Sequence, residues 1–228
     1  SLVVYPPLDL SGTGQGTVNE ILTFGSVGSG PYMAASGCVR WGVVTPGFGD
    51  VYGGCPTVTL PLGILQDDHK SHTATAGALG IDSPFTLAII LDGSEPGNVD
   101  QMSLVVSQLI LSFYSPASDV PIYSPYLTIP STIPNGSQGS GGSGNIFGLD
   151  LDQAAEAQRL IGLSGYSFSD VRIGLGAELQ QFDGHAYFWI GNIPDLIPPV
   201  PPQEIPEPAT FLMIGGGLLA LGLAGRRF

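Results

Sequence analysis

Short apolar segments separated by glycine and proline constrain this chain more than any other feature. The 228 residues include 34 glycines and 20 prolines, together nearly a quarter of the sequence. Both residue types favour turns over long helices, because glycine lacks a β-carbon and proline lacks a backbone N–H. Only 11% of the residues are charged, well below the usual share, whereas 43% are hydrophobic. The composition therefore predicts mainly β-structure around one sizeable core.

Six segments have strand length and an apolar pattern between turn residues. The last two of these segments, residues 171–179 and 186–190, flank Asp183-Gly184. This pair favours a tight hairpin because both central positions of a type I′ turn need positive φ. A parallel sheet would need a helix between most strands, so we expect an antiparallel β-sandwich that is jelly-roll-like. The six segments are residues 39–44, 58–65, 85–91, 104–114, 171–179 and 186–190.

One short helix is expected over residues 151–161. Asp150 can cap its N-terminus, with Gln153 in the capping-box position. Arg159 suits the negative C-terminal end, and Gly162 can adopt the left-handed conformation that ends a helix. This helix would connect strands of the sandwich.

The chain before its tail is strongly acidic. Residues 1–205 hold four basic and eighteen acidic residues, a net charge of −14. Such a field repels nucleic acid and anionic membranes, so we expect no nucleic-acid partner. It is compatible with divalent cations and with neutral or basic glycans.

The C-terminal tail combines Pro206-Glu207-Pro208, an uncharged apolar run over residues 209–224, and Arg226-Arg227. Proline keeps the first part extended. A helix over the apolar run would span about 24 Å, somewhat short of a hydrocarbon core of about 30 Å. The arginine pair favours the cytoplasmic side. The pattern predicts a hydrophobic transmembrane helix within residues 209–228 that resides in the membrane only transiently.

These three parts resemble the PEP-CTERM sorting signal. The resemblance implies that an exosortase in the inner membrane of an exopolysaccharide-producing Gram-negative bacterium processes the tail and releases the protein to the cell surface or the medium. It covers about twenty-four residues at the C-terminus, with Pro206-Glu207-Pro208 near their start. An ordinary C-terminal anchor after a proline linker is the alternative.

Three regions follow from these patterns: an extracellular β-sandwich domain at residues 1–191, a proline-rich linker at 192–208, and the sorting helix at 209–228. The linker should be a stiff polyproline II spacer. Because Ser1 is not methionine, we expect that a signal peptide was removed or left out. Parts of the body also resemble ectodomains of other PEP-CTERM proteins, which implies one sandwich-like exported domain and no activity.

Cys38 and Cys55 are the two cysteines of the chain. In an exported protein they are expected to form a disulfide, which would restrict the unfolded chain by about 3 kcal/mol. A metal site would need further ligands that their flanking residues do not offer.

An acidic loop after an apolar strand is a candidate calcium site. Asp92, Glu95, Asn98 and Asp100 supply four oxygen-bearing side chains, and calcium prefers a flexible cage of oxygen ligands. The spacing is not that of an EF-hand, and a long acidic turn explains the same residues. No cofactor is expected apart from this possible calcium ion; Asp67, Asp68, His69 and His72 also contain zinc-ligand residue types, but a solvated loop explains their spacing better.

Tyr187, Phe188 and Trp189 are consecutive aromatic residues. In a strand, Tyr187 and Trp189 share one face and Phe188 lies on the other. An exposed Tyr187–Trp189 face could stack sugar rings. Burial in the core is the favoured expectation, because strands with three large aromatics usually bury most of them.

No catalytic motif stands out; Gly162-Leu163-Ser164-Gly165, for example, lacks the spacing of a nucleophile elbow. We therefore expect a non-enzymatic, exported surface or matrix protein with a structural or adhesive role in exopolysaccharide or biofilm. One alternative is a carbohydrate-binding module, with or without calcium. Another is a self-associating filament subunit, built by strand addition at free sheet edges.

Overall fold

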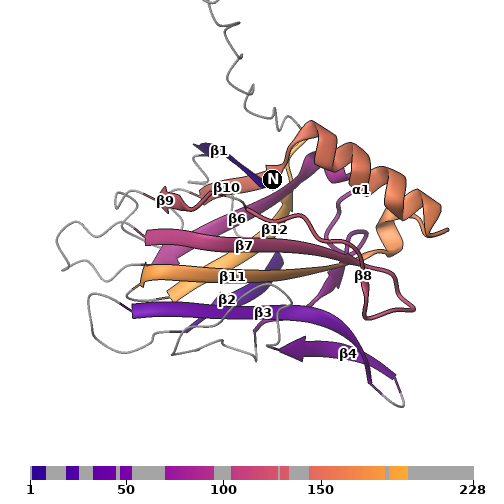
Figure 1. Cartoon of the computed structure of the whole chain (residues 1–228), viewed down its shortest axis with the longest axis horizontal. Helices are drawn as coiled ribbons and strands as arrows, with labels where there is room; N and C mark the ends of the chain where they lie inside the picture. The colour runs from indigo at the N-terminus through magenta and orange to yellow at the C-terminus, as the bar shows by residue number, and fades with distance from the viewer. Residues whose placement is uncertain are drawn as a thin grey trace, which may run out of the picture.

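The described part of the chain forms two antiparallel sheets and one α-helix (Figure 1). A computed structural model describes residues 2–8, 19–25, 33–44, 47–52, 70–94, 104–127, 129–133, 144–182 and 185–194. The prediction of a mainly β, antiparallel protein with one helix is confirmed for these residues. The expected strand at 58–65, the linker from residue 195 and the sorting helix lie outside them.

The first sheet has five strands, and every neighbouring pair in it is antiparallel. In spatial order they are β1 (Leu2–Leu8), β10 (Gly144–Leu149), β6 (Leu87–Ser94), β12 (His185–Asn192) and β2 (Asn19–Phe24).

The second sheet has seven strands, of which five form its main path. Their order is β4 (Gly47–Tyr52), β3 (Met33–Val44), β11 (Arg172–Phe182), β7 (Leu104–Tyr114) and β8 (Pro121–Tyr123). The two short remaining strands are β5 (Ala74–Thr75), paired with β11, and β9 (Ser131–Ile133), paired with β7. Two 3-10 turns, η2 (Pro84–Thr86) and η3 (Phe168–Asp170), precede β6 and β11.

Side chains that alternate along the strands of both sheets meet in one hydrophobic core. Phe24 and Phe188 come from the five-stranded sheet and pack edge to face, with ring centroids 6.1 Å apart. Phe113 on β7 packs against Phe168 of η3, also at 6.1 Å. Burying one such side chain contributes about 1.5–3 kcal/mol. The shared core therefore holds the sheets face to face.

Helix α1 (Leu151–Leu163) lies along one side of the sheets and buries Ala154, Ala157 and Ile161 against the core (Figure 1). The predicted N-cap is confirmed, since an Asp150 carboxylate oxygen accepts from the Gln153 N–H at 2.7 Å. The predicted end at Gly162 is wrong. The helix continues to Leu163, and the glycine with positive φ is Gly165, at +82°.

The predicted hairpin around residues 183–184 is also wrong. β11 pairs with β3 and β7 in the seven-stranded sheet, whereas β12 pairs with β6 and β2 in the five-stranded sheet. Two consecutive strands with an alternating apolar pattern can pair in one sheet or lie in opposite sheets. In both arrangements the apolar side of each strand faces the core. A local turn signal does not separate these two arrangements, and residues 183–184 themselves lie outside the described chain.

Arg172, the first residue of β11, joins segments that are distant in sequence. Its guanidinium carbon lies 3.9 Å from the centroid of the Trp41 ring on β3. Its Nη1 donates to the carbonyl oxygen and the Oγ1 of Thr73, both at 3.1 Å. Thr73 in turn donates its backbone N–H to Asp50 Oδ1 on β4 at 2.9 Å. These contacts fasten β3, β4, β11 and the residues before β5 at one corner.

Replacing Gly174 in β11 tests the packing of the seven-stranded sheet. A β-carbon there would lie 2.6 Å from the Val39 carbonyl oxygen and 3.1 Å from the Tyr114 ring. We expect Gly174→Ala to lower the free energy of unfolding by about 1–3 kcal/mol. The control is Gly162→Ala in α1, where no atom lies within 4 Å of the new carbon; it should be neutral or stabilising. Urea unfolding measures both, and equal stability of the two variants would contradict the expectation.

Candidate functional site: an aromatic sheet face

Strand β12 sends its three aromatic residues to two different faces of the five-stranded sheet. Phe188 is fully buried in the core, as expected. Tyr187 and Trp189 lie half-buried on the outer face, away from the other sheet. Their ring centroids are 6.3 Å apart and their planes are inclined by 38°. The favoured expectation that this pair is buried in the core is therefore wrong, because the strand's inward positions are already occupied by Ala186, Phe188 and Ile190.

A small apolar cluster supports this outer face. It contains Tyr5, Ala88, Ile90 and Ile146, from strands β1, β6 and β10, and Trp189 packs against it together with Val3 and Ile193. The Trp189 ring is thus fixed from one side by buried neighbours. A supported ring loses little conformational freedom when a ligand binds.

Tyr5 is the polar member of the cluster. Its hydroxyl donates to the Leu149 carbonyl oxygen at 2.9 Å. Burial, helped by the negative charge of Asp150, raises the pKa of Tyr5 to about 12. The phenol therefore stays neutral around pH 7 and remains a hydrogen-bond donor.

Polar side chains lie beside the aromatic pair. Asp92 on β6 and Thr23 on β2 are the two cross-strand neighbours of Tyr187, and Glu20 on β2 is opposite Trp189. The Thr23 hydroxyl donates to Glu20 Oε1. Asp92 is half-buried, and this burial raises the pKa of its carboxyl group. Two carboxylates therefore flank the aromatic pair.

A lysine completes this group of residues. The Lys70 ammonium lies 5.7 Å from the centroid of the Tyr187 ring, within the range of a cation–π contact. The residues after it are bonded to β2: the Thr23 N–H donates to Ser71 Oγ at 3.1 Å, and the His72 N–H donates to the Ile21 carbonyl oxygen at 3.0 Å. These bonds place Lys70 at the edge of the site. We call this group the aromatic face; its members are Glu20, Thr23, Lys70, Asp92, Tyr187 and Trp189.

Sequence patterns indicated only part of the aromatic face. The alternation of residues predicted that Tyr187 and Trp189 share one face, and Asp92 was predicted only as a candidate calcium ligand. Lys70, Glu20 and Thr23 were missed, because only the pairing of β2 with β12 brings them to the pair.

Of the four predicted calcium ligands, the structure places Asp92 beside the aromatic pair. The other three, Glu95, Asn98 and Asp100, lie outside the described residues. Within the part of the chain that is described, no three His, Cys, Asp or Glu side chains are grouped closely enough to hold a metal ion. Calcium binding stays a prediction.

Cys38 lies on β3 and is buried, and the described residues include no free cysteine. Its expected partner, Cys55, lies outside them. The bond between Cys38 and Cys55 stays a prediction.

The chemistry of the aromatic face suits a ligand with an apolar side and a polar rim. Two tilted rings offer an apolar surface, and carboxylate, hydroxyl and ammonium groups surround it. Ligand sites commonly combine such apolar contacts with a few fixed polar groups. A pyranose ring has this character, because its C–H groups form an apolar side and its hydroxyl groups both donate and accept hydrogen bonds.

Comparison with known proteins identifies the tail. Residues 204–227 match the PEP-CTERM protein-sorting motif, as the resemblance predicted. The match implies an exported protein that is processed by an exosortase and that is secreted or located at the cell surface. No curated protein and no solved structure matches the chain. Among the described helices none combines the length and apolarity needed to cross a membrane, and the predicted sorting helix lies outside that part of the chain.

Asp92→Asn tests the electrostatics of the aromatic face. Because burial raises the pKa of Asp92, the folded state binds its proton more tightly than the unfolded state does. The wild type should therefore lose stability as pH rises from the ordinary carboxyl pKa through the raised one. Asp92→Asn has no carboxyl group at this position and lacks this loss. Its free energy of unfolding relative to the wild type should therefore increase as pH rises between the two pKa values, and the difference should persist at neutral pH.

Urea unfolding at several pH values measures this difference. Asp82→Asn, which removes an exposed carboxylate, controls for the loss of one negative charge. A stability difference between wild type and Asp92→Asn that stays constant from pH 3 to pH 7 would contradict the expectation.

Proposed function

We propose that this protein is a non-enzymatic, exported component of the cell surface or extracellular matrix, with an adhesive role in binding exopolysaccharide. The observation that carries the proposal is the supported Tyr187–Trp189 pair on an outer sheet face, in a chain with a sorting motif for export. The aromatic face is the proposed contact with the polysaccharide.

The route to the surface belongs to the same proposal. The producing cell is Gram-negative, and the tail over residues 209–228 spans its inner membrane transiently before an exosortase acts. The proline-rich linker at 192–208 separates this tail from the exported domain at 1–191. The motif match at 204–227 supports this division, because it begins within the linker and ends near the terminal arginines.

We also infer a jelly-roll connectivity for the exported domain. With β1 and β4 set aside as outer strands, the sheets have the orders β10-β6-β12-β2 and β3-β11-β7-β8. Successive long strands then alternate between the sheets, as in a double Greek key. Lectin domains are among the proteins built this way. A fold alone does not assign a function, so this likeness supports the proposal only together with the aromatic face.

Binding would proceed by stacking and hydrogen bonding. The apolar side of a sugar ring would lie on Tyr187 and Trp189, and its hydroxyl groups would bond to Asp92 and Lys70. The acidic character of the chain, with a net charge of −13, disfavours acidic polysaccharides and leaves neutral or basic ones.

Calcium would assist at the same place. Asp92 is opposite Tyr187 in the sheet, so an ion held by Asp92, Glu95, Asn98 and Asp100 would lie beside the aromatic pair. It would offset the negative charge of these residues and could also bind sugar hydroxyl groups directly.

Self-association into filaments is a second candidate. In the described sheets β2 and β4 are end strands with a paired neighbour on one side only. End strands can add a strand from another molecule. Electron microscopy of the purified protein that shows only monomers would exclude this candidate.

Removing either aromatic ring should weaken polysaccharide binding. We expect Tyr187→Ala and Trp189→Ala each to reduce affinity about tenfold, equivalent to about 1.4 kcal/mol, because each ring supplies part of the stacking surface. Affinity electrophoresis of the full chain in gels that contain neutral or acidic polysaccharides measures the change.

The control is Phe85→Ala, which removes an aromatic ring elsewhere, on η2, where Phe85 is 42% exposed. Circular dichroism confirms that each variant is folded. Migration of Tyr187→Ala and Trp189→Ala that equals the wild type in every retarding gel would overturn the proposed contact.

The sorting motif predicts a mass difference. Alanine at Pro206, Glu207 and Pro208 should block processing, so the variant should keep its tail and be heavier than the wild type. The control replaces Pro201 and Pro202 in the same linker. Intact mass of protein recovered from the medium and the cell envelope measures the outcome; processing of the motif variant at the wild-type site would argue against exosortase recognition of these residues.

A further inference from the structure

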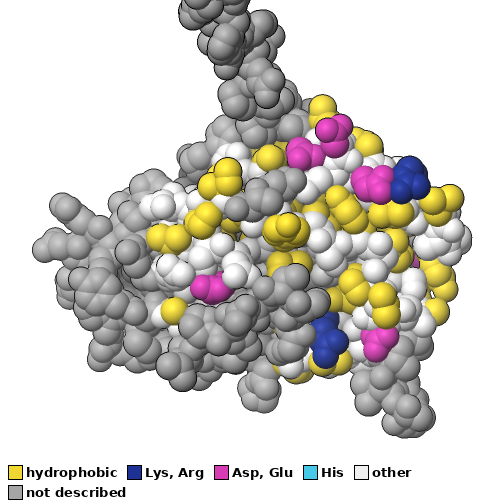
Figure 2. All heavy atoms as spheres, viewed as in Figure 1, with side chains coloured by type: hydrophobic (Ala, Val, Ile, Leu, Met, Phe, Trp, Pro, Cys, Tyr) yellow, Lys and Arg dark blue, Asp and Glu magenta, His cyan; other side chains and the backbone are white. Residues whose placement is uncertain are grey.

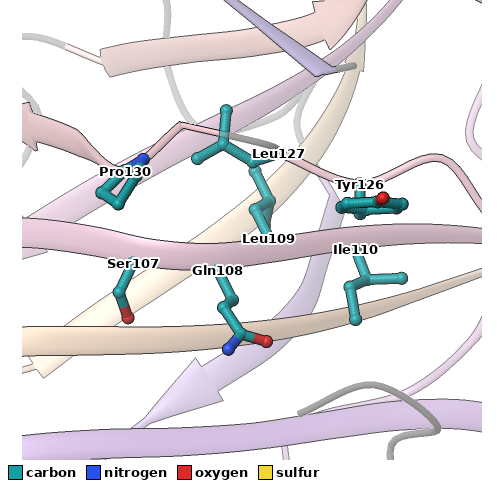
Figure 3. Close-up of a pocket in the computed structure, with 7 residues that line it drawn as sticks. All are labelled: Ser107, Gln108, Leu109, Ile110, Tyr126, Leu127 and Pro130. Atoms are coloured by element: carbon teal, nitrogen blue, oxygen red, sulfur yellow. The ribbon is translucent and has the colours of Figure 1, made fainter.

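A groove lies beside β7 on the seven-stranded sheet, distant in sequence from the aromatic face. It encloses about 460 Å³ and is lined by Ser107, Gln108, Leu109, Ile110, Tyr126, Leu127 and Pro130 (Figure 3). This volume is within the range of about 300–1,000 Å³ that is usual for small-molecule sites. Leu109 and Leu127 belong to the core between the sheets, whereas Ile110 alternates with core residues and turns outward.

The walls of the groove are held by backbone hydrogen bonds. The Leu127 N–H donates to the Leu109 carbonyl oxygen at 2.8 Å, and the Leu111 N–H donates to the Pro125 carbonyl oxygen at 3.0 Å. On the other side, the Leu2 N–H of β1 donates to the Tyr126 carbonyl oxygen at 3.0 Å. The segment that carries Tyr126 is thus fixed between the two sheets. A fixed wall needs little ordering when a ligand binds.

Tyr126 gives the groove an aromatic wall. Its side chain is 54% exposed, and Figure 3 shows the ring nearly edge-on above β7, beside Ile110. The Ile110 side chain, only 6% exposed, lies below. One side of the groove therefore presents an accessible ring next to a buried apolar side chain, because Tyr126 and Ile110 are paired in a β-bridge.

Uncharged polar groups line the other side. Gln108 has an amide that can donate and accept, and the Ser107 hydroxyl donates to the Glu178 carbonyl oxygen at 3.1 Å and can still accept. Among the described residues that line the groove, none is charged. Figure 2 shows mostly hydrophobic and uncharged polar side chains over the middle of this face, with charged side chains near α1 and along the lower edge and one acidic side chain left of the centre. The groove matches a neutral ligand that has one apolar side and several hydroxyl groups.

We propose that this groove is a second saccharide site, selective for neutral glycosyl units, which stack on Tyr126 and bond to the Gln108 amide. The inference rests on the proposed polysaccharide-binding function and extends it. The aromatic face and the groove lie on the outer faces of different sheets, so one molecule can hold two polysaccharide chains. The protein then acts as a cross-linker of neutral polysaccharide, and two linked sites gain avidity that neither has alone.

Isothermal titration calorimetry of the full chain tests this, with neutral hexasaccharides of β-1,4-glucan, β-1,3-glucan and α-1,6-mannan as probes and hexagalacturonate as the acidic probe. We expect two neutral oligosaccharides to bind per wild-type chain. Tyr126→Ala and Gln108→Ala should leave one site, and Tyr126→Phe, which keeps the ring, should retain both. Phe85→Ala controls for removal of an exposed ring elsewhere. Hexagalacturonate should not occupy the groove.

The outcomes separate the two proposals. If the wild type binds only one neutral oligosaccharide, and this binding is lost in Tyr187→Ala but unchanged in Tyr126→Ala, the groove is not a saccharide site and the proposed function stands. If the single bound oligosaccharide is lost only in Tyr126→Ala, the groove is a saccharide site, but the aromatic face is not, and the protein cannot cross-link polysaccharide chains. Absence of binding to every neutral probe overturns both. Circular dichroism spectra that match the wild type show that a lost site is not the result of unfolding.

Discussion

Burial of apolar side chains between two sheets is the interaction on which everything else in this fold depends. The largest fully buried residues, among them Phe24, Phe113, Phe147 and Phe188, come from both sheets. Because side chains alternate along a strand, filling the core from one face leaves every second residue on an outer face. Tyr187 and Trp189 reach the surface because Phe188 is inside, and Tyr126 reaches it because Leu127 is inside. Both candidate binding surfaces are thus consequences of core packing.

Local patterns in the sequence predicted the elements better than their partners. The strand over 104–114 and the N-cap at Asp150 are confirmed, because apolar alternation and capping depend on neighbouring residues alone. The hairpin at 183–184 failed, because the choice between pairing in one sheet and crossing to the other is decided by β3, β7, β6 and β2, which occupy both sides of β11 and β12. The helix runs two residues past its expected end at 161, to Leu163, because either Gly162 or Gly165 could adopt the left-handed conformation after a helix and the local pattern does not choose between them.

In the candidate sites, too, the sequence predicted individual residues better than their neighbours in space. Three consecutive aromatic residues were visible in the sequence, but their neighbours were not, because hydrogen bonds of Ser71 and His72 to β2 help to place Lys70 beside Tyr187. The groove left no sequence signal at all. Its residues belong to β7 and to a connecting segment that meets β7 through a single bridge between Ile110 and Tyr126. Sites assembled from strand register become visible only when the register is known.

The position of β12 bears on the timing of folding. It is the last described strand in the chain, yet it lies between β6 and β2 inside the five-stranded sheet and contributes Phe188 to the core. Until residues 185–192 have paired, β2 has no described partner strand in that sheet, and the core lacks the Phe188 side chain. A chain exported from its N-terminus would therefore complete the five-stranded sheet only once residues 185–192, which lie just ahead of the matched sorting motif at 204–227, are also outside.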